Sequence, residues 1–180
     1  HELNYVSDVD LLYLYSHEGM EEALPDSIPV LVQRLFQWLG KLLSDHVDGD
    51  RVFETDLRLR PGGKDGPLVP SLSGAADHYL QHGRPWERQM LLKARPVAGN
   101  RSLGTAFLQE VRPFVFRRFL DFQALDEIRA MRDRILSEAP RPRSDWENFD
   151  VKLGVGGIRE VEFLVQSLQL IYGGRHPELE

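Results

Sequence analysis

Cysteine is absent from this 180-residue chain, and so is any long uninterrupted apolar run. Without cysteine there can be no disulfide, thiolate metal site or cysteine nucleophile, and a reducing cytoplasm is the expected compartment. No apolar run approaches the roughly 20 residues that a spanning helix requires, so we expect no membrane contact. His1 is preceded by no initiator methionine or signal peptide, which indicates a piece of a longer protein.

Excess positive charge is lacking too, because 22 Lys and Arg face 28 Asp and Glu, for a net charge of -6. Such a balance does not favour the basic surface that follows a nucleic-acid backbone, so nucleic acid is not an expected partner. Hydrophobic residues make up 42% and charged residues 28%, values that are typical of folded globular proteins.

Hydrophobic periodicity predicts strands in the first third of the chain and long helices beyond residue 104. Segments 4–15 and 51–60 have strand character, and Ile28 to Leu43 has helical spacing. Further helices are predicted over 71–80, 86–93, 104–119, 121–138 and 157–172. We therefore predict an α+β fold, with an N-terminally truncated domain over 1–103 and a C-terminally truncated helical domain over 104–180.

Two aspartates two residues apart, Asp8 and Asp10, carry the main chemical signal. On a strand their carboxylates point to the same side about 7 Å apart, where they repel unless a cation compensates them. If the strand of Asp56 pairs beside theirs, a third carboxylate joins, and oxygen-only donors suit Mg²⁺. The alternative is a solvated strand start, since Asp-x-Asp alone is a common pattern.

Basic side chains accompany these acids. Strand alternation predicts that Arg58 and Arg60 share the face of Asp56, where their forked guanidinium groups suit phosphate. Lys93 and Arg95 are expected on one face of an extended segment. The glycine-rich loop after Arg60 could offer backbone N–H groups to an anion. The alternatives are a solvated sheet face with ion pairs, an ordinary turn and an ordinary surface.

The last predicted helix begins after Gly156 and Gly157, and an uncovered helix N-terminus there would be an anion site. Glu160 lies toward the apolar flank of that helix, where a glutamate usually has a partner such as a cation or a metal-bound water. We regard Glu160 and Glu162 as candidates to support a metal site.

Five segments together resemble one enzyme family, the glutamine synthetase adenylyltransferases, which are polymerase-β-like nucleotidyltransferases. They are ELNYVSDVDL at 2–11, DLRLRPGGKDGPLV at 56–69, WERQ at 86–89, KAR at 93–95 and GGIREVEF at 156–163. The resemblance implies a mixed sheet flanked by helices, followed by a bundle-like helical domain.

The family carries two related catalytic halves, and two segments favour the N-terminal one. These are 112–122 and the Ile158-Arg159-Glu160 form of the last motif. The resemblance implies that this half removes AMP from a tyrosine of adenylylated glutamine synthetase by Mg²⁺-dependent phosphorolysis, releasing ADP. A PII-type regulatory protein is an expected partner of the whole enzyme.

By the same resemblance, the metal ligands and catalytic residues are Asp8, Asp10 and Asp56. The residues expected to bind nucleotide or phosphate are Ser7, Arg58, Arg60, Lys93 and Arg95. Two alternatives stay open: the adenylylating half, which transfers AMP from ATP, and a silent nucleotide-sensing or docking module.

Overall fold

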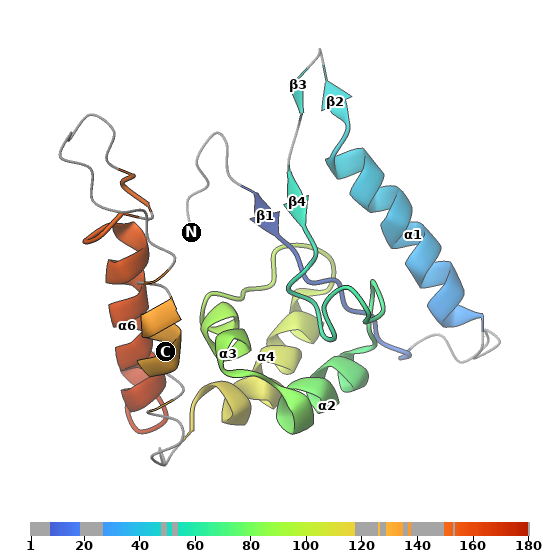
Figure 1. Ribbon diagram of the computed structural model, residues 1–180. Helices are drawn as coiled ribbons and strands as arrows, with labels where there is room; N and C mark the ends of the chain where they lie inside the picture. The colour runs from blue at the N-terminus through green and yellow to red at the C-terminus, as the bar shows by residue number, and fades with distance from the viewer. Residues whose placement is uncertain are drawn as a thin grey trace. The chain divides into compact units, whose positions relative to one another are not determined.

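The computed structural model describes residues 8–18, 27–47, 50–51, 54–117, 126, 129–134, 137, 150–152 and 154–179. Within these ranges the chain is mainly helical, with two short pairs of strands (Figure 1). It divides into two compact units, one formed by 1–82 and 95–110 and the other by 83–94 and 111–180. None of the described helices is both long and apolar enough to span a membrane.

The first unit is built on a parallel pair of strands, β1 (Val9–Asp10) and β4 (Thr55–Asp56). Two backbone hydrogen bonds of 2.7 and 2.9 Å hold the pair, and Asp10 lies directly opposite Asp56. Parallel neighbours need a crossover connection between them. The helix α1 (Ile28–Leu43) lies within this connection.

Both strands are shorter than predicted. The prediction of a strand through residue 60 is wrong, because the backbone turns directly after Asp56. The Arg58 amide donates to the Asp56 side chain at 2.8 Å, and Pro61 has no N–H to offer a neighbouring strand. Upstream of this turn, β2 (His46–Val47) and β3 (Asp50–Arg51) form a short antiparallel pair.

The first predicted strand also ends early, at Asp10. Beyond it, the described pairing of this segment is a single parallel bridge between Tyr15 and Ser71. The Tyr15 amide donates to Pro70, and the Leu72 amide donates to Tyr15 at 2.8 Å. This bridge ties the chain after β1 to the start of α2 (Leu72–His82). Segment 4–7 of the predicted strand lies outside the described residues.

Helix α1 confirms its prediction and buries one face. Ile28 and Val32, one turn apart, pack with Val69 in a small core. Tyr13 and Phe36 pack against this core, with ring centroids 4.6 Å apart. A second apolar stripe on α1 is exposed: Leu31, Leu35, Trp38 and Leu42.

Helix α2 packs through small residues in the same unit. Ala75, Ala76 and Tyr79 are fully buried there. The Tyr79 ring lies 6.1 Å from Phe107, which belongs to α4 (Arg101–Val115). This contact fixes α2 against the first part of α4.

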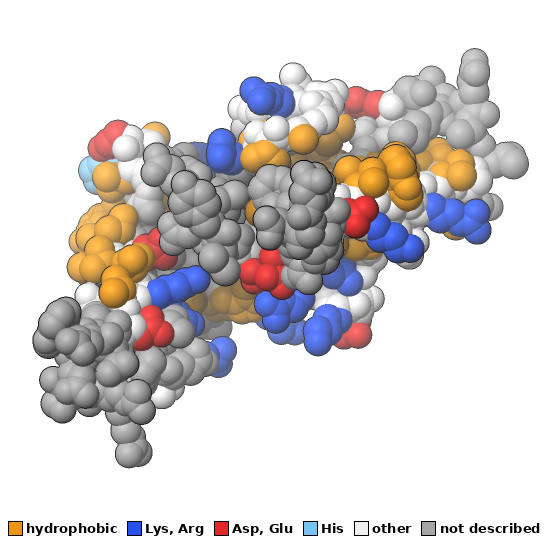
Figure 2. All heavy atoms as spheres, turned by 90° about the horizontal axis from the view of Figure 1, so that it is seen from above, with side chains coloured by type: hydrophobic (Ala, Val, Ile, Leu, Met, Phe, Trp, Pro, Cys, Tyr) orange, Lys and Arg blue, Asp and Glu red, His pale blue; other side chains and the backbone are white. Residues whose placement is uncertain are grey.

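In the second unit, α3 (Pro85–Leu92) packs against α6 (Ile158–Tyr172), followed by the short 3-10 helix η2 (Pro177–Leu179). The buried apolar residues of this unit include Leu91, Val111, Phe114, Val115 and Leu170. Within the predicted helix 121–138, the described residues 126, 129–134 and 137 are helical. Apolar side chains also lie at the surface (Figure 2). The exposed apolar residues of α6 are Ile158, Val161, Leu164, Val165, Leu168 and Tyr172.

Candidate functional site

The parallel strand pair brings two of the three predicted carboxylates, those of Asp10 and Asp56, onto one face. Asp10 and Asp56 are direct partners, so their side chains leave the sheet on the same side, from strands about 4.8 Å apart. Asp8 precedes Asp10 by two residues, directly before β1, and its charge acts on the Arg58 guanidinium as those of Asp10 and Asp56 do. The expected pairing of the two strands is therefore confirmed, and Asp56 is the most buried of the three acids.

Arg58 is the immediate partner of Asp56. Its Nε donates to both carboxylate oxygens, at 2.8 and 3.0 Å, and its Nη2 donates to one of them. The Arg58 backbone N–H donates to the same carboxylate at 2.8 Å. The arginine predicted to bind phosphate thus neutralises the acid predicted to bind a metal.

The electrostatics of this pair extend to all three acids. Hydrogen bonds from Arg58 hold the pKa of Asp56 below its ordinary value, against an opposing contribution from burial. The pKa of the Arg58 guanidinium is raised, first by Asp56 and further by the charges of Asp8 and Asp10. All three carboxylates therefore act on one guanidinium group.

The donor chemistry and the register of Asp10 and Asp56 fit a divalent cation, provided that Arg58 releases Asp56. Oxygen atoms alone are what Mg²⁺ prefers, and neighbouring strands supply them here. Yet among the residues that the structure describes, no three Asp, Glu, His or Cys side chains are grouped to hold an ion. Arg58 holds both Asp56 oxygens, so an ion would bind Asp56 in its place.

Arg60 makes a different set of contacts. Its guanidinium donates to the carbonyls of Leu57 at 2.7 Å, Lys64 at 3.2 Å and Gly66 at 3.3 Å. It therefore holds the glycine-rich loop in shape, while its phosphate-binding role stays a prediction. Strand alternation did not anticipate this difference between Arg60 and Arg58.

The glycine-rich loop uses its own N–H groups. The amides of Gly63, Asp65 and Gly66 donate to carbonyls of Arg60 or Gly62 within the loop. These three amides are therefore not available to an anion, and anion binding by the loop stays a prediction. Gly62 has a φ of 75°, in the left-handed region where glycine is favoured.

The remaining predicted binders are Lys93, Arg95 and Ser7. Lys93 caps the end of α3 in the second unit, where its Nζ donates to Glu162 at 2.8 Å. Arg95 is exposed in the first unit, after the boundary. Ser7 lies outside the described residues.

The N-terminus of α6 is not the open anion site that the paired glycines suggested. The amides of Ile158 and Arg159 donate to backbone carbonyls of residues 151 and 152, at 2.9 and 3.1 Å. Glu160 turns its carboxylate back onto the Gly156 amide at 3.0 Å. Backbone carbonyls and the helix's own acid therefore occupy these donors.

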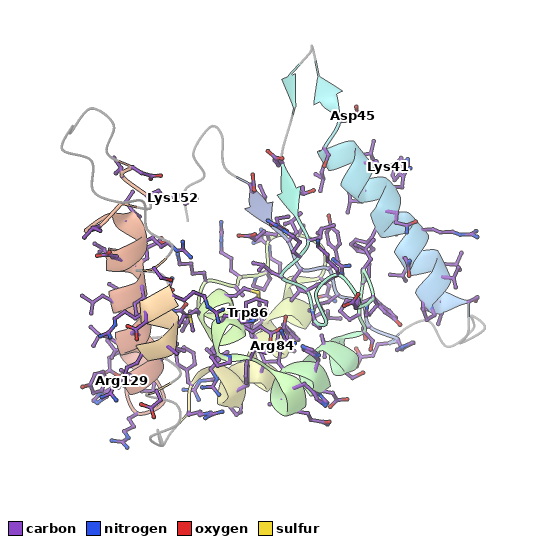
Figure 3. The ribbon with its side chains drawn as sticks, in the orientation of Figure 1. Lys41, Asp45, Arg84, Trp86, Arg129 and Lys152 are labelled. Atoms are coloured by element: carbon purple, nitrogen blue, oxygen red, sulfur yellow. The ribbon has the colours of Figure 1, made fainter. Side chains whose placement is uncertain are left out.

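Sequence reasoning missed the structural use of the charged residues that begin α3, where Figure 3 labels Arg84 and Trp86. Glu87 is buried and accepts a 2.6 Å hydrogen bond from the Arg84 amide, in a capping box. Arg88 is buried with its guanidinium 5.1 Å from the Phe114 ring centroid. Pro85 followed by an acid two residues later was the available signal.

Comparison with known proteins identifies the family. A family model described as Glutamate-ammonia ligase adenylyltransferase matches residues 1–110, more than half of the chain. The chain belongs to this adenylyltransferase family. Residues 129–179 match a second model, described as GlnD PII-uridylyltransferase. The adenylyltransferase match contains Asp8, Asp10 and Asp56.

Full-length relatives of this adenylyltransferase chain share close to half of its residues. Proteins named "Bifunctional glutamine synthetase adenylyltransferase/adenylyl-removing enzyme" are 48% identical in Xanthomonas campestris pv. campestris (strain B100) and 47% identical in Stenotrophomonas maltophilia (strain K279a). One from Rhodopseudomonas palustris (strain TIE-1) is 43% identical. Each comparison covers 99% of this chain, which spans only 18 to 19% of the relatives' length.

Proposed function

We propose that this adenylyltransferase chain carries the carboxylate centre of a nucleotidyltransferase half that removes AMP from glutamine synthetase. The observation that carries the proposal is the parallel register that opposes Asp10 to Asp56, with Asp8 two residues before Asp10. In this proposal, β1 and β4 belong to the mixed sheet of a polymerase-β-like domain. The relatives' names include both adenylyl transfer and adenylyl removal.

In the proposed reaction, inorganic phosphate attacks the α-phosphorus of adenylyl-tyrosine. The new P–O bond makes ADP, the P–O bond to the tyrosine breaks, and the phenolic oxygen leaves with the electron pair and takes a proton. Phosphoryl transfer depends mainly on position and on neutralised charge. A bound Mg²⁺ would supply that neutralisation at the phosphate and at the leaving oxygen.

The chain's own residues would position the reactants. Asp8, Asp10 and Asp56 would hold the cation at one face of the strand pair, while Arg58 would donate to phosphate oxygens. A phenol with an ordinary pKa of about 10 is a fair leaving group once its oxygen is neutralised or protonated. Adenylylated glutamine synthetase is the proposed substrate, a PII-type protein the proposed regulator, and the cytoplasm the proposed location.

The test is an assay of the double variant Asp8→Asn and Asp10→Asn in the protein that carries this chain. We expect phosphate-dependent release of ADP from adenylylated glutamine synthetase to be lost, while the fold is kept. Unchanged release would refute the proposal. If ATP-dependent labelling of glutamine synthetase is lost instead, the chain is the adenylylating half. If the unaltered chain turns over neither substrate, it is a silent binding module.

A further inference from the structure

The ion pair between Arg58 and Asp56 joins a largely buried carboxylate to an exposed guanidinium group. The Asp56 side chain is 13% exposed, whereas the Arg58 side chain is 70% exposed. Asp56 is fixed by its strand pairing to Asp10, and Arg58 reaches it from the turn that follows. The arginine can therefore leave toward solvent without disturbing β4.

The positive charge of Arg58 acts on all three aspartates of the candidate site. Its charge interacts with Asp8 and Asp10 as well as with Asp56. Arg60, two residues later, instead bonds loop carbonyls and holds the fold of the loop. Of these two arginines, Arg58 thus bonds a carboxylate and Arg60 bonds the loop.

We propose that Arg58 is an exchange residue, bonded to Asp56 in the metal-free site and released to a phosphate oxygen when a divalent cation binds the carboxylates. The inference rests on the proposed function and adds a regulatory property to the same site. A cation must displace Arg58 from Asp56, and a phosphate must draw it away. If the cation binds first, the ion pair is already broken when phosphate binds, and the same holds in the reverse order.

Metal and phosphate should therefore strengthen each other's binding through Arg58. Linkage requires this effect to be reciprocal, so it can be measured from the metal alone. Breaking an exposed ion pair corresponds to roughly a 1.4- to fivefold change in affinity. Removing Arg58 should thus tighten metal binding by this factor. It should also make the metal affinity less dependent on phosphate.

The experiment titrates the chain with Mn²⁺ at about 0.15 M KCl, where charges more than about 8 Å apart are largely screened. Free Mn²⁺ is followed by electron paramagnetic resonance, with and without inorganic phosphate. Arg58→Gln should bind Mn²⁺ roughly 1.4- to fivefold more tightly than wild type, and phosphate should raise the Mn²⁺ affinity of this variant less than that of wild type. Arg58→Lys, which keeps the charge but loses the fork, should be intermediate.

Lys64→Gln is the matched control, because it removes one positive charge from the exposed tip of the neighbouring loop. It should behave as wild type. If Arg58→Gln binds Mn²⁺ no more tightly than wild type while Asp56→Asn abolishes binding, the exchange is refuted and the proposed function stands. If neither wild type nor Arg58→Gln binds Mn²⁺, both proposals fail.

Discussion

A methyl group added at Gly66 tests the conformation of the loop that follows the acidic strand. A Cβ built there would lie 2.0 Å from the carbonyl oxygen of Pro61, well inside the 3.0 Å below which real Cβ contacts essentially never occur. The obstacle is backbone, so no side-chain rotation relieves it. Gly66 also accepts the Nε hydrogen bond of Arg60, so the loop must open and lose that contact as well.

Gly66→Ala should therefore destabilise the chain by about 2 kcal/mol, combining overpacking with a lost hydrogen bond. The measurement is urea unfolding followed by circular dichroism. Gly40→Ala is the matched control, because its Cβ would meet nothing within 4 Å on helix α1. It should stabilise the chain by roughly 0.5 to 1 kcal/mol.

Gly63 adds an intermediate case, because its φ is +59° and its Cβ would meet only one atom, at 3.9 Å. Gly63→Ala should cost about 1 kcal/mol for the left-handed backbone alone. The expected order of stability is Gly40→Ala, wild type, Gly63→Ala and then Gly66→Ala. A Gly66→Ala chain as stable as wild type would refute the described loop, provided that Gly40→Ala behaves as expected.

Three further predictions concern burial and charge. Val32→Ala should cost about 2 kcal/mol in urea unfolding, whereas the neighbouring Leu31→Ala, 59% exposed, should stay within about 0.5 kcal/mol; equal costs would contradict the packing of α1. The stabilisation by Asp56 is present above its ordinary pKa of 3.8 and is lost as pH falls through its lower folded value. The stability gap to Asp56→Asn should therefore close in acid, and a gap that is constant with pH would count against the pair. A double-mutant cycle of Lys93→Ala and Glu162→Ala, both about half exposed, should give a coupling of about 0.5 kcal/mol or less; a coupling above about 2 kcal/mol would contradict it.

The helices were the most predictable part of the fold. The segments that became α1 and α6 each repeat apolar residues at helical spacing over four turns, so local pattern sufficed to locate them. The end of β4 was not predictable in this way. Alternation continues to residue 60, but the side chain of Asp56 takes the Arg58 amide and turns the backbone.

The candidate site was predictable in its residue types but not in its partners. Asp8 and Asp10 follow from spacing alone, whereas the opposition of Asp10 and Asp56 depends on a register between distant segments. Periodicity gives no information on such a register. The different contacts of Arg58 and Arg60 also depend on the turn, which the alternating pattern concealed.

The most direct test of the central claim is the location of Mn²⁺ in crystals of this chain by anomalous diffraction. The account predicts a peak within coordinating distance of the carboxylate oxygens of Asp8, Asp10 and Asp56, with Arg58 turned away from Asp56. A Mn²⁺ peak bound elsewhere, with Asp56 still bonded to Arg58, would contradict it.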